Sequence, residues 1–127
     1  MGPPMNESQL LVPESFAELF ITPGLRKPSI DRAALAEKFE LCEDMAQMLT
    51  EHASQVLVKL GITEGDVLAR MLQGLVAEEG RLSEGEALWV VSRLAELLQW
   101  PLPARLAEPL GEEAQSWWQQ QLVRAAA

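Results

Sequence analysis

Apolar residues recur at intervals of three and four along most of the chain, which is the spacing of one face of an α-helix. The longest series consists of Leu35, Phe39, Cys42, Ala46, Leu49, Ala53, Val56 and Leu60. It predicts a helix that begins after Ser29, a good N-cap, and ends at Gly61, a C-cap glycine. A second stripe consists of Leu41, Met45, Met48 and His52. Two stripes predict a wide apolar face, typical of a helix at the centre of a bundle, with residues 40–43, where they meet, as a possible break.

Shorter apolar stripes and capping signals predict helices on both sides of this segment. The ranges are 13–20, 63–80, 83–100 and 112–124. The clearest start is Ser83 with Glu86 three residues later, which is the pattern of a capping box. No segment alternates apolar and polar residues over more than a few positions, so no β-strand is predicted.

The fold class that follows is all-α, a small helical bundle of four to five helices. Residues 1–12 are expected to be a flexible N-terminus, in which residues 1–4 are either native or the remnant of a fusion. The bundle domain is expected over 13–101. Residues 102–127 form a C-terminal extension whose helix docks on the bundle, swaps between protomers or stays mobile.

Charge and composition narrow the function. Of the 127 residues 48% are hydrophobic, which is enough for a core, and 19 Asp and Glu against 10 Lys and Arg give a net charge of -9. This charge opposes binding to nucleic acid or to an anionic membrane surface. No apolar run approaches the ~20 residues of a membrane span, and no signal peptide is visible, so we expect a cytoplasmic protein with a reduced cysteine.

Few residues offer chemistry. The single cysteine and single histidine exclude a structural zinc site and an intrachain disulfide. Cys42 and His52 are about 15 Å apart along one helix, too far to share a metal or a proton. Phosphate-loop, nucleophile-elbow, zinc-protease and calcium-loop motifs are absent from the sequence. We predict no catalytic residue, no cofactor and no metal, while a metal site built from Glu43, Asp44 and a distant residue stays open.

An acidic helix surface is one candidate for partner binding. Glu40, Glu43 and Asp44 lie close together on the long helix. They form either an ordinary solvated face or a docking surface for a basic partner, whose association rate such a patch would raise.

Aromatic residues at both ends are the other candidates, because aromatic side chains are enriched at interface hot spots. Trp117 and Trp118 are adjacent and therefore point about 100° apart on a helix. Either this helix is packed on two sides or one tryptophan is offered to a partner. Phe16 and Phe20 either pack on the bundle or fill a groove on a partner.

Four segments resemble a known family. They read VPESFAELF (12–20), FELCEDMAQMLTEHA (39–53), LGITEGDVL (60–68) and WVVSRLAELLQWP (89–101). Together they look like small proteobacterial proteins often labelled "ATPase with chaperone activity", over residues 12–101. The chain carries no nucleotide-binding pattern, so we interpret the label as inherited from association with a chaperone-type ATPase, and no catalytic residue is carried over.

Three hypotheses follow. The first is a non-catalytic adaptor or regulator that binds another protein through its apolar, aromatic and acidic surfaces, in association with chaperones. The second is an obligate helical homo-oligomer whose terminal helices complete a neighbour's core. The third is a small-ligand-binding bundle or small enzyme that uses Glu43 or Asp44 in an interior cavity.

Overall fold

The computed structural model describes residues 12–21, 30–78 and 81–126, and every regular element in these ranges is a helix. The elements are α2 (Glu14–Ala17), η1, a 3-10 turn (Glu18–Phe20), α3 (Arg32–Leu60), α4 (Glu64–Ala77), α5 (Glu84–Leu98) and α6 (Glu112–Ala126). The prediction of a small all-α bundle is confirmed. No described helix is both long enough and apolar enough to cross a bilayer.

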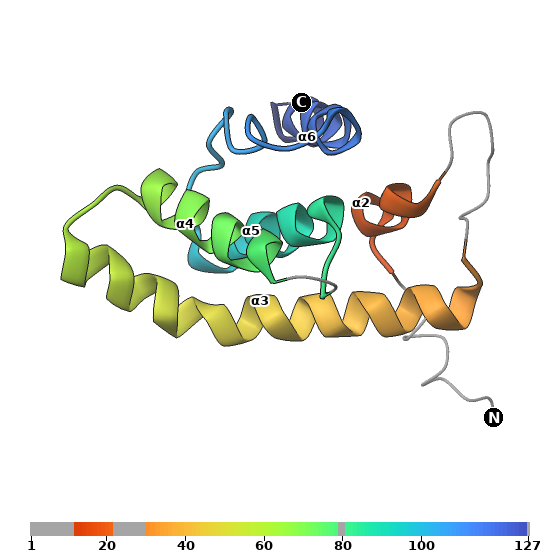
Figure 1. The fold of residues 1–127 in the computed structure, drawn as a ribbon, viewed down its shortest axis with the longest axis horizontal. Helices are drawn as coiled ribbons and strands as arrows, with labels where there is room; N and C mark the ends of the chain where they lie inside the picture. The colour runs from red at the N-terminus through yellow and green to blue at the C-terminus, as the bar shows by residue number, and fades with distance from the viewer. Residues whose placement is uncertain (1–11, 22–29, 79–80, 127) are drawn as a thin grey trace.

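The helices stack in layers (Figure 1). The long α3 forms one side, α4 and α5 lie on it, and α6 lies beyond α5. Helix α5 contacts α2, α3, α4 and α6. Its buried residues are Glu86, Ala87, Leu88, Trp89, Val90, Val91, Leu94 and Ala95. Five consecutive apolar residues cover the whole circumference of a helix, so α5 is the central element of the bundle.

The prediction that the long helix lies at the centre is therefore wrong. On α3 most of the first stripe packs inward, with Leu35, Cys42 and Ala46 buried against the bundle, while Leu60 at the helix end is 50% exposed. Of the second stripe only Met45 packs against the core, because Leu41 is 47% exposed, Met48 is 75% exposed and His52 is also exposed. The helix is continuous through residues 40–43.

Local capping signals locate the helix ends. The N-cap of α3 is Asp31, and Ser29, the predicted N-cap, lies outside the described residues. Gly61 adopts the left-handed conformation (φ 63°) of a C-cap glycine, as predicted. At the start of α5 the capping box is present. The Ser83 hydroxyl accepts the Glu86 N–H at 3.1 Å, and the Glu86 carboxylate accepts the Ser83 N–H at 3.0 Å.

Both terminal elements join the same core. Buried residues of α2, α3, α4, α5 and α6 form one continuous cluster, and Val12 packs against it. The C-terminal helix is thus docked on its own chain, which is one of the three arrangements left open by the sequence. Residues 1–11, within the N-terminus expected to be flexible, lie outside the described ranges.

Candidate docking groove

Ser15 connects the N-terminal segment to two other helices. The indole N–H of Trp89, on α5, donates to the Ser15 hydroxyl at 3.0 Å. The indole N–H of Trp117, on α6, donates to the Ser15 carbonyl oxygen at 2.8 Å. These two bonds fix α2 between α5 and α6, because each satisfies a polar atom inside an otherwise apolar contact.

Aromatic packing holds the same segment against α5. The Phe16 ring meets Trp89 edge-on at 5.2 Å between centroids, and it lies 5.5 Å from the Phe20 ring. Further along, η1 approaches the first turn of α5 so closely that a Cβ atom on Gly85 would lie 2.8 Å from the end of the Leu19 side chain. Glycine at position 85 allows this approach.

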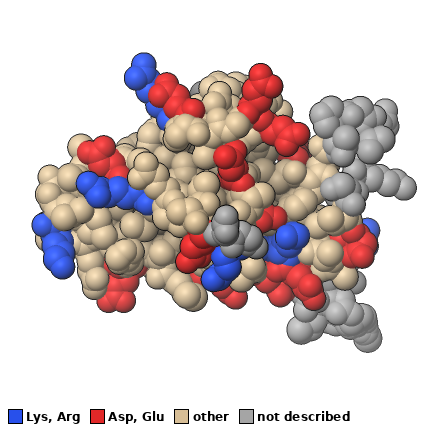
Figure 2. Space-filling model, in the orientation of Figure 1, with Lys and Arg blue, Asp and Glu red and all other residues tan. Residues whose placement is uncertain are grey.

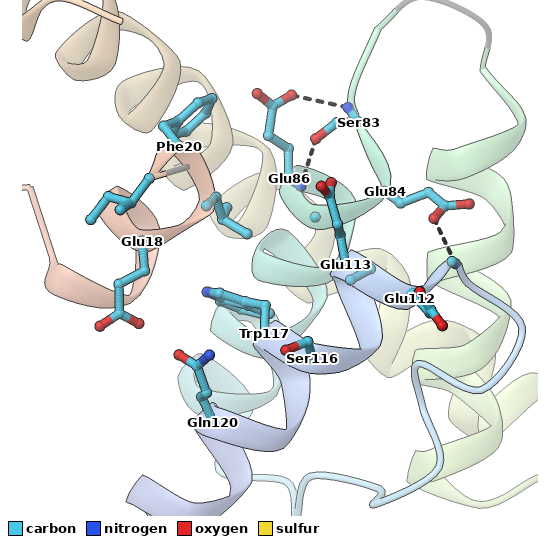
Figure 3. A pocket seen from close by; sticks show the side chains of 15 residues that line it. Glu18, Phe20, Ser83, Glu84, Glu86, Glu112, Glu113, Ser116, Trp117 and Gln120 are labelled. Carbon is cyan, nitrogen blue, oxygen red and sulfur yellow. Dashed lines mark hydrogen bonds between the residues drawn. The ribbon is translucent and has the colours of Figure 1, made fainter. Parts of the chain in front are cut away.

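A groove lies where η1, the first turn of α5 and the first half of α6 meet (Figure 3). Its volume is about 790 Å³. Its apolar lining residues are Leu19, Phe20, Ile21, Ala114 and Trp117. They come from segments about 90 positions apart in the sequence, so the apolar floor exists only in the folded chain.

The charged lining of the groove has one sign. Five glutamates line it, and none of its lining residues is Lys or Arg. They are Glu18, Glu84, Glu86, Glu112 and Glu113. Figure 2 shows carboxylates over the α6 layer as well as along α3. The groove therefore presents a negative field to an approaching ligand.

Three of these carboxylates already have partners within the chain. Glu84 accepts the Gly111 N–H at 2.9 Å, at the start of α6. Glu86 closes the capping box and lies 3.4 Å from the Lys38 ammonium. Glu18 forms an ion pair with Arg124 near the end of α6. These three carboxylates therefore connect the segments that form the walls of the groove.

Glu112 and Glu113 are different, because neither makes an ion pair or a side-chain hydrogen bond with any described residue. Both are exposed in the first turn of α6, at the positive end of the helix dipole. In Figure 3 the Glu113 side chain extends from α6 toward the first turn of α5. These two carboxylates are available to a ligand.

The structure corrects the aromatic part of the predicted partner site. Phe16 is 0% exposed and Trp118 is 1% exposed, so neither side chain is offered to a partner. Trp118 donates from its indole N–H to the Ala104 carbonyl oxygen at 3.2 Å, while Trp117 is directed at Ser15. Helix α6 is therefore packed on two sides. Trp117, 6% exposed, contributes only the floor of the groove, which Phe20 also lines.

The three acidic residues of the predicted partner site do not form one surface in the structure. The Arg93 guanidinium on α5 donates to both Glu43 oxygens, at 2.9 and 3.1 Å, and these hydrogen bonds lower the pKa of the Glu43 carboxyl. Glu43 therefore belongs to an internal ion pair beside a smaller hollow of about 490 Å³. Glu40 and Asp44 are exposed on α3 and do not line the groove.

Cys42 and His52 do not share a site in the structure. Cys42 is buried, and burial, with the nearby negative charge of Glu86, raises the pKa of its thiol to about 12. His52 lies exposed on the outer side of α3. Within the ranges that the structure describes, no three His, Cys, Asp or Glu side chains are grouped so that they could hold a metal ion.

Sequence reasoning missed the groove as a site. Glu112 and Glu113, which have no partner within the described part of the chain, are recognisable in the sequence only as an acidic first turn that suits a helix dipole. In comparisons with family models, curated proteins and solved structures, nothing matches the chain. The resemblance over residues 12–101 stays a prediction.

Proposed function

We propose that this protein is a non-catalytic interaction module, an adaptor or regulator, and that another protein docks in the groove between η1, α5 and α6. The groove itself carries the proposal. It combines an apolar floor with a charged rim, which is the distribution found in protein interfaces. A volume of about 790 Å³ is in the range of established ligand sites.

The build of the groove also favours docking. Its floor residues Phe20 and Ile21 are half-buried, so part of each apolar side chain is available for contact. Its walls are fixed by the capping box of α5, by the bond from Gly111 to Glu84 and by the Arg124 ion pair. A preformed site of this kind loses little conformational entropy on binding.

The resemblance over residues 12–101 adds a cellular setting to this proposal. A partner associated with a chaperone-type ATPase, in the cytoplasm, fits both the label of that family and the net charge of -9. Catalysis is not part of the proposal, which rests on the distribution of apolar and charged groups in the groove.

A homo-oligomer is the second candidate. The observation that favours it is the outer side of α3, where Leu41, Met48 and Val58 are exposed. Such side chains contribute to helix pairing when a second copy covers them. In this arrangement α2 and α6 still complete the core of their own chain.

Site-specific photo-crosslinking tests the two candidates side by side. The photoreactive residue p-benzoylphenylalanine replaces Ser116, exposed on the groove wall, or, as a control, Gln55, exposed on α3. Both variants are checked for native helix content and irradiated in cells. We expect a discrete heterologous product from position 116 that position 55 does not give. Products from position 55 alone, at twice the chain mass, would instead support the homo-oligomer.

A further inference from the structure

The groove side of α6 has two chemically different positions one turn apart. Glu113, Trp117 and Gln120 all line the groove, and their spacing of four and three residues places them on one helix face. Glu113 and Trp117 are therefore about 6 Å apart along the helix axis. One position presents a carboxylate that has no partner among the described residues, and the next contributes to the apolar floor.

The apolar position is completed from the other wall. Leu19 and Ile21 line the groove opposite α6, Leu19 from η1 and Ile21 from the position directly after it. Both are half-buried, whereas the Phe20 ring is directed away from Trp117 in Figure 3. A large aliphatic or aromatic side chain entering here gains apolar contact on two sides.

The charged position carries charge of only one sign, which is negative. An anionic group would meet Glu112 and Glu113, and of the three other carboxylates in the lining Glu18 is paired with Arg124 and Glu86 with Lys38. A cationic group would meet the two carboxylates that lack a partner among the described residues. Because none of the described lining residues is Lys or Arg, an incoming cation is the complement of this wall.

We infer that the groove recognises a partner segment in which a Lys or Arg lies about 6 Å from a large apolar side chain. In an extended segment, at about 3.3 Å per residue, this distance corresponds to two positions. In a helical segment it corresponds to one turn, three or four positions. The basic residue pairs with Glu112 or Glu113, and the apolar residue packs on the floor that Leu19 and Trp117 line. This inference rests on the proposed function, because it names the chemistry of the partner that docks in the groove.

A displayed library of random dodecapeptides, selected on the immobilised full-length protein, tests it directly. We expect enrichment of peptides with Lys or Arg two to four positions from Leu, Ile, Phe or Met. Enrichment of apolar peptides without a basic residue, or no enrichment at all, would overturn the inference. Capture of a heterologous product at Ser116 in the crosslinking experiment would still support the proposed function in either case.

Paired variants locate the binding of an enriched peptide. Glu112→Gln with Glu113→Gln removes both carboxylates of the first turn of α6, and Glu40→Gln with Asp44→Asn removes the same charge from α3. Circular dichroism first checks that both proteins keep their helix content. We expect the groove variant to bind about twofold to fivefold more weakly, and the α3 variant to bind as the parent does. The reverse result would move the site to α3 and overturn the inference.

The same peptide tests both halves of the motif. Replacing its basic residue by Gln should weaken binding to the parent protein but leave binding to the Glu112→Gln/Glu113→Gln variant unchanged. Replacing its apolar residue by Ser should weaken binding to both proteins. Binding that is insensitive to salt up to about 0.5 M NaCl would contradict a charge-selective groove, because screening acts on exposed pairs of this kind.

Discussion

Arg93 is held between two carboxylates, one on its own helix and one on α3. It donates to Glu43 at 2.9 and 3.1 Å and to Glu96 at 2.9 Å. The hydrogen bonds to Glu43 raise the pKa of Arg93 and lower that of Glu43. The bidentate pair connects α3 to the central helix at the surface of the core, where both side chains keep limited contact with water.

This pair predicts a specific loss of stability in acid. The pKa of Glu43 is lower in the folded protein than its ordinary value of 4.5. At pH values between the lowered pKa of Glu43 in the folded protein and 4.5, the unfolded chain binds more protons than the folded protein does. The free energy of unfolding therefore decreases as the pH falls through this range. The contribution is fully present above pH 4.5 and is lost as the pH passes below the folded pKa. We expect Glu43→Gln to remove this part of the pH dependence.

Urea unfolding followed by circular dichroism, at pH values from about 6 down to 3, measures the effect. The matched variant is Arg93→Gln, which removes the other side of the pair and should flatten the same part of the curve. A difference between the parent and Glu43→Gln that stays constant over the whole pH range would show that the ion pair is not its source.

The role of Glu43 shows where prediction from sequence ends at the residue scale. Its place on an acidic helix surface is visible in the sequence, because Glu40 and Asp44 are its neighbours. Its partner Arg93 is 50 positions away, and only the packing of α3 on α5 brings the two together. The buried state of Cys42, in contrast, was predictable from its place in the apolar series.

Helix ends are decided by short-range chemistry, and the start of α5 and the end of α3 were predicted, whereas the N-cap of α3 is Asp31 and not Ser29 as predicted. The capping box of α5 needs only Ser83, Glu86 and the turn between them. Which helix is central is decided by long-range packing. The long helix has more apolar positions than α5, yet Leu41 and Met48 face outward because α4 and α5 cover only one side of it.

Helix α6 provides the prediction at the scale of elements. Trp118 is one of the largest fully buried side chains, and its indole N–H reaches the Ala104 carbonyl in the preceding loop. We expect Trp118→Ala to lower the free energy of unfolding by about 3–5 kcal/mol, because it leaves a large cavity and an unpaired carbonyl. Chemical denaturation measures the change.

Val123→Ala on the same helix is the control, since Val123 is 67% exposed. Its effect should stay within about 0.5 kcal/mol. If Trp118→Ala were equally mild, α6 would not be an integral layer of the bundle, and one wall of the groove would be lost with it.

At the scale of the molecule, the groove depends on the order of the layers. Its lining comes from η1, the first turn of α5 and α6, which are close only because α2 and α6 both pack on α5. Each segment was predicted as a helix from its own pattern. That these segments lie side by side was not predicted, because no local sequence signal shows which helices are neighbours in the fold. Phe20 and Trp117 were identified as candidates for partner binding, but the reason given, exposure, differs from their actual place in the floor.

A shared core also predicts how the molecule unfolds. Since buried residues of all five α-helices form one cluster, we expect a single cooperative transition. Three probes report on different layers. Circular dichroism follows all helices, tryptophan fluorescence follows α5, α6 and the loop between them, and the thiol of Cys42 follows α3.

The thiol is the most discriminating of these probes. Only the thiolate reacts with a disulfide reagent, and both burial and a pKa of about 12 suppress it in the folded protein. At pH 8 labelling of Cys42 should therefore follow the opening of the α3–α5 contact. Across a urea series we expect the labelled fraction, the fluorescence change and the loss of helix to share one midpoint. Fluorescence that changes at lower urea than thiol labelling would show that the part of the fold that carries the tryptophans, α5, α6 and the loop between them, opens before the surroundings of Cys42. The groove would then belong to a separately melting part of the fold.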